Sequence, residues 1–300
     1  MTCITVSNLT KIFGPQTVVQ DVSFTLEKNT ATALIGPNGA GKTTTLSMLT
    51  GLLEPTSGII RMDGVRDIRA EIGFLPQYPQ YFSWLSALEY TEMVAQLSTM
   101  PKRDAKRVAQ KMLEFVGLGD ALNKKTAIFS GGMKQRLGIA QALVHQPKLL
   151  LLDEPVSALD PVGRREIMNL LKEIQQDTTI LYSTHILNDA EEMTDQVLFL
   201  RNGILVEQGS LSDVRERFDE PRYKVQFSSS EEALQFASQS ELSAIAEGAA
   251  VYVEIRDDNP TMQQLLARLA ASPFMVIQVE RVTASLEEIF LKVAGQHESV

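Results

Sequence analysis

Residues Gly36 to Thr43, GPNGAGKT, have the composition and spacing of a loop that binds phosphate. Glycines let the backbone turn so that several N–H groups point at one anion. The apolar run Ala31–Ile35 precedes the loop, and a helix-like run follows it, with its positive end toward the same anion. Lys42 can reach the β- and γ-phosphates of a nucleotide, and the Thr43 hydroxyl can bind Mg²⁺. Strand, glycine loop and helix in this order favour a nucleotide site over an ordinary glycine-rich turn.

A second segment, Leu149 to Pro155 or LLLLDEP, has the pattern of a buried strand that ends in two carboxylates. Both would lie at the carboxyl edge of the sheet, where ligands of α/β folds bind. Asp153 would then hold Mg²⁺, and Glu154 would accept a proton from the water that attacks the γ-phosphate. Taken alone, the segment is equally typical of an ordinary acidic turn after a strand. The phosphate-binding loop earlier in the chain favours the catalytic interpretation.

A third segment, Phe129 to Arg136 or FSGGMKQR, places Ser130, Gly131 and Gly132 before a predicted helix. The hydroxyl, the backbone N–H groups and the helix dipole together predict a second anion site.

With these three segments in this order, the chain resembles the nucleotide-binding subunit of an ABC transporter over roughly residues 1–210. In that family the third segment is the signature motif, which usually begins with leucine. Phe129 replaces this leucine and stays apolar, so we expect it to pack in the same way. The resemblance implies a P-loop NTPase fold of the α/β class. It would have a mainly parallel core sheet, an antiparallel β subdomain and a helical subdomain.

The resemblance assigns four further residues, and three of them have a plainer alternative. Phe13 would stack on adenine, although it could be a core phenylalanine. Gln77, in GFLPQ, would bridge Mg²⁺ and the transport subunit, although it could be a surface glutamine. Asp160 ends the segment SALD, which touches the opposite subunit in the family. His185, in STH, would contact the γ-phosphate, although a single histidine is more often structural.

The predicted catalytic residues are therefore Glu154, His185, Gln77 and Lys42, and the predicted magnesium ligands are Thr43, Gln77 and Asp153. The predicted ATP-binding residues are Phe13, Gly36, Pro37, Asn38, Gly39, Ala40, Gly41, Lys42, Thr43, Thr44, Ser130, Gly131, Gly132 and Asp160.

The family resemblance also implies partners. Each ATP would be clamped between the Lys42 loop of one ATPase subunit and the Ser130 loop of another. That second subunit could be a copy of this chain or a different ATPase.

The opening ITVSNLTKIFG and the closing segment SLEEIFLKV resemble the ATPase subunits of bacterial ABC-2 type exporters for drugs, antibiotics or sodium. This implies a permease on a separate chain and a peripheral location on the cytoplasmic face of the membrane. An importer subunit is the closer alternative. A second alternative is a soluble ABC ATPase that acts on ribosomes, on DNA or in cluster assembly. A P-loop kinase or GTPase is a third, but such proteins lack the segment FSGGMKQR and a histidine at the position of His185.

Composition narrows these classes. The net charge of −9 argues against a nucleic-acid partner, which would favour a basic face. No apolar run approaches the roughly 20 residues of a membrane span. The single cysteine, Cys3, cannot form an internal disulfide, which fits a reducing compartment.

Strand-like and helix-like segments alternate along the chain, which predicts a largely parallel α/β sheet. Antiparallel strands are expected before the phosphate loop, and a helical pattern with few breakers is expected over 86–121. A charged stretch, 214–221, divides an ATP-binding domain, 1–215, from a small α+β accessory domain, 222–300. We expect Trp84 to pack in the core rather than to contact a partner.

Overall fold

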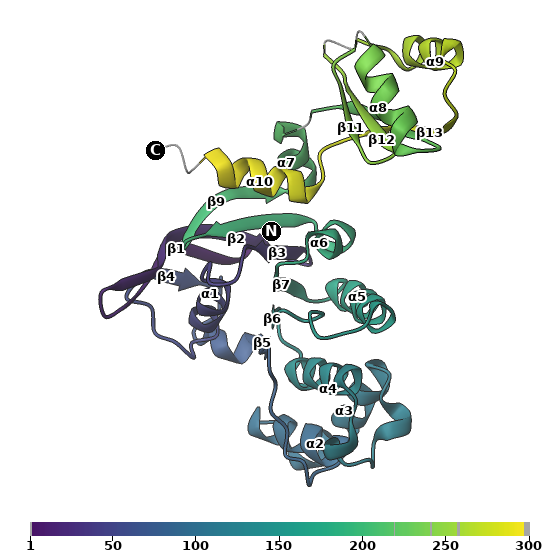
Figure 1. The fold of residues 1–300 in the computed structure, drawn as a ribbon. Helices are drawn as coiled ribbons and strands as arrows, with labels where there is room; N and C mark the ends of the chain where they lie inside the picture. The colour runs from purple at the N-terminus through teal and green to yellow at the C-terminus, as the bar shows by residue number, and fades with distance from the viewer. Residues whose placement is uncertain (1, 219, 241, 257–258, 297–300) are drawn as a thin grey trace. The chain divides into compact units, whose positions relative to one another are not determined.

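The structure is a computed structural model, and it describes residues 2–218, 220–240, 242–256 and 259–296. The chain divides into two compact units, Met1–Leu211 and Ser212–Val300 (Figure 1).

A six-stranded sheet forms the centre of the first unit, with strand order β5-β6-β7-β3-β8-β9. All neighbouring pairs are parallel except β8 and β9. Every residue of β3, β6 and β7 is buried, which explains their continuous apolar sequences: both faces of a parallel sheet are covered. The strands are β3 Ala31–Ile35, β5 Ile72–Leu75, β6 Leu149–Asp153, β7 Thr179–Thr184, β8 Gln196–Arg201 and β9 Ile204–Ser210.

A second sheet in this unit is antiparallel, with order β2-β1-β4. Its strands are β1 Thr2–Phe13, β2 Gln16–Glu27 and β4 Ser57–Arg61. Its core side chains pack in one cluster with residues of α1 and of the six-stranded sheet. The antiparallel strands predicted before the loop are therefore confirmed, and they are longer than the sequence indicated.

The α-helices of the first unit either pack beside the sheets or form a helical lobe from α2, α3 and α4 (Figure 1). They are α1 Lys42–Leu49, α2 Ala87–Leu97, α3 Lys102–Phe115, α4 Gly131–Leu143, α5 Pro161–Gln175 and α6 Leu187–Met193. Short 3₁₀ turns lie at Ile68–Glu71, Gly119–Ala121 and Thr126–Ile128. These layers confirm the predicted α/β class.

The helical pattern predicted over 86–121 is confirmed, and it is divided between α2 and α3. The break falls where Thr99 adopts a left-handed φ of +67° and Pro101 occupies the N-cap of α3. Proline fixes φ and has no N–H, so a helix restarts after it more readily than it continues through it. Trp84 does not pack in the core: it is 66% exposed and stacks on Phe82 at a centroid distance of 5.1 Å.

The second unit contains a four-stranded antiparallel sheet with order β11-β12-β10-β13. Two helices follow the first and third strands, which gives the βαββαβ order of a ferredoxin-like fold. The elements of this unit are α7 Leu211–Phe218, β10 Arg222–Phe227, α8 Ser230–Gln239, β11 Ala244–Glu247, β12 Ala250–Glu254, α9 Met262–Ala271, β13 Val276–Val282 and α10 Leu286–Gln296.

Phe227 lies at the centre of the second unit's core. It is fully buried and its ring lies 5.1 Å from that of Phe236 and 6.3 Å from that of Phe274. We predict that Phe227→Ala lowers the free energy of unfolding of this unit by about 3–5 kcal/mol, through lost burial and the cavity left behind. Hydrogen exchange of the β10 and β12 amides measures this separately from the first unit. Leu234→Ala, an exposed position on α8, is the control, and equal effects of the two changes would contradict the assignment.

Candidate functional site

The loop after β3 has a shape that only glycine allows at two positions. A Cβ on Gly36 would lie 2.2 Å from the carbonyl oxygen of Leu200 in β8. Gly41 has a φ of +103°, and a Cβ there would lie 2.8 Å from the carbonyl oxygen of Val18. The turn between β8 and β9 also supports the loop, because the Gly203 N–H donates to the Ala40 carbonyl at 3.0 Å. The predicted phosphate loop is therefore held in place by neighbouring backbone.

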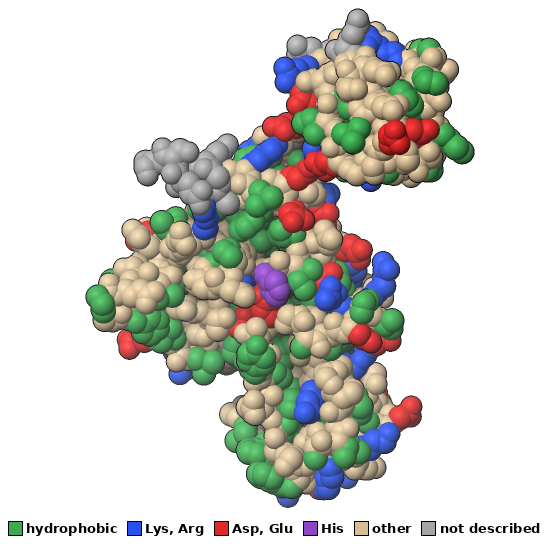
Figure 2. Space-filling view, viewed as in Figure 1, with side chains coloured by type: hydrophobic (Ala, Val, Ile, Leu, Met, Phe, Trp, Pro, Cys, Tyr) green, Lys and Arg blue, Asp and Glu red, His purple; other side chains and the backbone are tan. Residues whose placement is uncertain are grey.

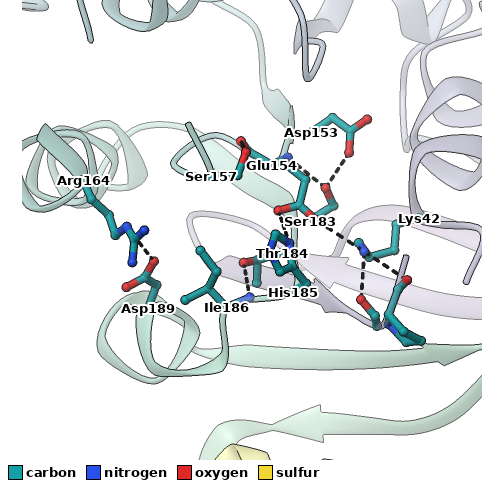
Figure 3. Close-up of polar contacts among 12 residues, drawn as sticks. Lys42, Asp153, Glu154, Ser157, Arg164, Ser183, Thr184, His185, Ile186 and Asp189 are labelled. Atoms are coloured by element: carbon teal, nitrogen blue, oxygen red, sulfur yellow. Dashed lines mark hydrogen bonds and ion pairs between the residues drawn. The ribbon is translucent and has the colours of Figure 1, made fainter. Parts of the chain in front are cut away.

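Lys42 is the first residue of α1, and its side chain folds back over the loop (Figure 3). Its Nζ donates to the carbonyl oxygens of Gly36 at 2.8 Å and of Pro37 at 3.3 Å. The same atom lies 3.4 Å from Oε1 of Glu154, and both side chains are only 6% exposed. A buried ammonium needs such compensation, because an unpaired buried charge is costly.

The two carboxylates at the end of β6 are both buried and share one hydroxyl (Figure 3). The Ser183 hydroxyl, on neighbouring β7, donates to Oδ1 of Asp153 at 2.5 Å and accepts from the Glu154 N–H at 2.9 Å. Glu154 has a φ of +52°, which is unusual for a residue with a side chain. Backbone strain of this kind is concentrated at functional sites, where the surrounding structure maintains it.

His185 follows the end of β7 and completes a line of polar groups with Lys42 and Glu154 (Figure 3). Its Nδ1 lies 2.9 Å from Oε2 of Glu154, while Lys42 approaches the other carboxylate oxygen. The His185 side chain is 46% exposed, so the three side chains extend from the buried Lys42 to the protein surface at His185. A carboxylate held in this way can accept a proton from a water molecule beside it.

A hollow of about 370 Å³ lies between the loop and this carboxylate. Its lining residues are Val18, Pro37, Asn38, Gly39, Ala40, Gly41, Lys42, Thr43, Thr44, Gln77 and Glu154. The structure therefore brings together most of the residues that the sequence predicted for nucleotide binding.

The remaining predicted residues do not line this hollow, as far as the described part of the chain goes. Ser130 caps α4 by accepting from the Met133 N–H at 3.3 Å, and Asp160 caps α5 by accepting from the Gly163 N–H at 2.8 Å. Phe13 is exposed, and Nζ of Lys11 lies 5.0 Å from its ring centroid. Phe129 is buried, as its apolar character predicted.

The donor set suits magnesium rather than a metal that needs many protein ligands. The described residues contain no group of three or more histidine, cysteine, aspartate or glutamate side chains that could hold a metal. They do place the buried Asp153 carboxylate at the same sheet edge as the exposed Thr43 hydroxyl. Mg²⁺ is commonly held by one or two carboxylates together with substrate phosphates, so these residues fit it.

Ser183 is a site residue that sequence reasoning did not identify. It directly precedes the Thr184–His185 pair, and as a residue in a buried strand it had no feature that marked it. Its role depends on the lateral pairing of β6 with β7, which aligns Asp153 with Ser183. Val18 was missed for a similar reason, because β2 reaches the loop only in three dimensions.

Comparison with known proteins then decides the family. The chain is 40% identical over 97% of its length, and 99% of the relative's, to the uncharacterized ABC transporter ATP-binding protein YxlF of Bacillus subtilis (strain 168). It belongs to the ABC transporter ATP-binding proteins. The family model for ABC transporters matches residues 19–157. A second model, the C-terminal domain of DrrA1-3-like ATP-binding proteins, matches residues 209–294.

Two further relatives carry more specific names. The linearmycin resistance ATP-binding protein LnrL of Bacillus subtilis (strain 168) is 30% identical over 96% of this chain and 97% of its own. The bacitracin transport ATP-binding protein BcrA of Bacillus licheniformis is 37% identical over 72% of each chain.

Solved structures agree with this assignment. The ATP-binding subunit of an ABC transporter superposes with a TM-score of 0.65 at 32% identity, over 72% of this chain and 93% of its own. A dimeric ATP-binding cassette bound to ADP and Pi, in a post-hydrolysis state, has a TM-score of 0.62 at 28% identity, over 69% and 98%. The predicted ABC ATPase identity is therefore confirmed: the chain is a nucleotide-binding ATPase subunit. None of its described helices is long and apolar enough to cross a membrane.

The shared hydroxyl of Ser183 can be tested directly. We predict that Ser183→Ala lowers the free energy of unfolding by about 1–3 kcal/mol, because it leaves a buried N–H and a buried carboxylate without their partner. Urea denaturation of the full chain measures the loss. Ser238→Ala is the control, since that exposed hydroxyl donates only to a carbonyl of its own helix. Equal stability of Ser183→Ala and the wild type would contradict this account.

Proposed function

We propose that this chain hydrolyses ATP with Mg²⁺ to drive a permease on a separate chain, at the cytoplasmic face of the membrane, and that the permease is an exporter. The observation that carries the ATPase part is the line formed by Lys42, Glu154 and His185 beside the phosphate loop. The named linearmycin and bacitracin relatives, and the DrrA-like match over residues 209–294, support export. We assign ATP binding to 1–215 and an accessory role to 222–300.

The geometry supports a role for each side chain. Loop N–H groups and Lys42 bind the phosphates, and an incoming γ-phosphate competes with Glu154 for the Lys42 ammonium. This competition frees Oε1 of Glu154 to accept a proton from the attacking water. His185 holds Oε2 of the same carboxylate and contacts the γ-phosphate. Thr43, Asp153 and Gln77 would hold Mg²⁺, which would neutralise phosphate charge when bound.

The Ser130 loop supports a head-to-tail pair of ATPase subunits. Apart from its own helix backbone and chain neighbours, a Cβ added to Gly131 or Gly132 would meet no atom within 4 Å, so packing against other elements does not require glycine there. Backbone exposed at the start of α4 suits an approaching phosphate. We propose that Ser130, Gly131 and Gly132 close on the ATP of a second subunit, with Asp160 near the same interface. A related ATP-binding cassette that is dimeric with ADP and Pi bound supports such a pair. Phe13 would stack on the adenine.

An exposed aromatic surface supports the site of permease contact. Tyr78, Phe82 and Trp84 follow Gln77 within seven residues, and all three are exposed. Figure 2 shows hydrophobic side chains gathered over the end of the helical lobe that carries α2. Exposed aromatic clusters commonly mark protein interfaces. Because this surface adjoins Gln77, contact with the permease would be sensed at the nucleotide.

We predict that Glu154→Gln lowers kcat for ATP by about 100-fold or more, through loss of the general base. Nucleotide affinity should be kept or increased, since the change also removes a negative charge 3.4 Å from Lys42. Phosphate release and nucleotide titration of the purified full chain measure the two effects. Rapid hydrolysis by this variant would reject Glu154 as the base.

The same variant tests the transport assignment. Tagged Glu154→Gln chain, purified from membranes with ATP, should retain a polytopic membrane protein, whose identity would narrow the exported substance. Recovery of ribosomes or of soluble partners alone would reject the transporter assignment and leave the ATP site unaffected.

The aromatic surface gives a separate prediction in this background. We predict that Trp84→Ser costs about 2 kcal/mol or more of permease-binding free energy, as loss of a central interface aromatic commonly does. Quantification of the co-purified membrane protein measures it. Leu52→Ser, at another exposed apolar position, is the control, and equal recovery with both variants would place the permease elsewhere.

A further inference from the structure

The segment that carries His185 has limited support of its own. His185 lies between the end of β7 and the seven-residue helix α6, which begins at Leu187. At the entry to this helix, the Ile186 N–H donates to the Thr184 hydroxyl at 2.9 Å. At its far end, the buried hydroxyls of Tyr182 and Thr194 lie 2.6 Å apart. A helix this short depends on tertiary contacts, so its position fixes where His185 points.

One contact joins the middle of α6 to the first turn of α5. Nε of Arg164 lies 3.5 Å from Oδ2 of Asp189, and these side chains are only 29% and 16% exposed (Figure 3). Within the described residues, both atoms are buried and have no hydrogen-bond partner. Each of these two atoms therefore has the other as its nearest compensation, and removal of either side chain leaves the other buried atom without it. Burial raises the pKa of Asp189, the Arg164 guanidinium opposes this, and Glu192 adds to it.

Arg164 is also connected to the segment Ser157–Asp160. The Arg164 N–H donates to the Asp160 carbonyl at 2.9 Å, in the turn that Asp160 caps. At the other end of the segment, the Ser157 hydroxyl donates to the Glu154 carbonyl at 3.2 Å. A closed series of contacts thus runs from Glu154 through Ser157–Asp160, α5 and α6, and returns to Glu154 through His185.

We propose that Arg164 and Asp189 are positioning residues, whose ion pair fixes α6 against α5 and so holds His185 at the Glu154 carboxylate. This inference rests on the proposed function, because it concerns the same hydrolytic site. It also connects the segment Ser157–Asp160 to His185 through α5 and α6, without a contribution from the nucleotide.

The same two helices supply a matched control. A second ion pair joins Arg165 of α5 and Glu192 of α6. Nη2 of Arg165 and Oε2 of Glu192 lie 3.7 Å apart, and the two side chains are 73% and 57% exposed. It has the same charges and adjacent positions, but solvent can replace either partner. Exposed ion pairs of this kind contribute little.

The test compares Asp189→Asn and Arg164→Gln with Glu192→Gln and Arg165→Gln in the full chain. We expect Asp189→Asn to lower kcat about tenfold while KM for ATP changes less than about twofold. Displacement of a catalytic group by about 1 Å can cost about 100-fold, and loss of this one contact should displace His185 by less than that. The Arg164→Gln/Asp189→Asn double variant should be no worse than either single variant, since all three break one interaction. The Glu192 and Arg165 variants should match the wild type.

A spectroscopic measurement gives an independent reading. The chain has three histidines, so its imidazole resonances can be assigned by substitution. The His185 resonance should shift in Asp189→Asn and stay unchanged in Glu192→Gln. An unchanged kcat and an unchanged His185 resonance in Asp189→Asn would overturn the proposal. A loss of activity in this variant that came with a raised KM and was fully accounted for by lower thermal stability would also overturn it. Inactivity of the wild type with its permease would instead reject the proposed function, and the resonance shift would still test the positioning role.

Discussion

The buried contact between the Lys42 ammonium and the Glu154 carboxylate is the interaction on which the first unit's organisation depends. One group comes from the helix after β3, and the other from the end of β6, with β7 between the two strands. Two buried charges are stable there only because carbonyl oxygens, a histidine and a fixed backbone surround them. The parallel sheet supplies this precision, since it aligns the carboxyl ends of its strands at one edge.

Much of this site could be predicted from sequence because its chemistry is encoded in short, contiguous segments. The loop from Gly36 to Thr43 needs glycine for steric reasons that the structure makes explicit at Gly36 and Gly41. The position of Gln77 on the rim of the hollow also follows from the order of strands and helices. The role of Ser183 depends on the pairing of β6 with β7, and that of Val18 on the approach of β2 to the loop, and neither leaves a local pattern in the sequence.

The parts of the fold that were missed share a physical reason. Helices α6 and α7 and strand β11 are short, and β9 and β11 are edge strands with no fully buried residue. Such elements form because of their neighbours rather than their own propensities. Trp84 was misplaced by the same kind of error, because hydrophobic character alone does not distinguish a core side chain from one at an interface.

The hydroxyl of Ser183 has a consequence for how the site responds to its ligands. It has one hydrogen, which goes to Asp153, and its oxygen also accepts the Glu154 N–H. Because the hydroxyl both donates and accepts a hydrogen bond, it links the Asp153 side chain to the Glu154 backbone, two residues with different proposed roles. A displacement of the Asp153 carboxylate is therefore transmitted to the Glu154 backbone through two successive hydrogen bonds. The Asp153 carboxylate and the Glu154 backbone are thus expected to move together.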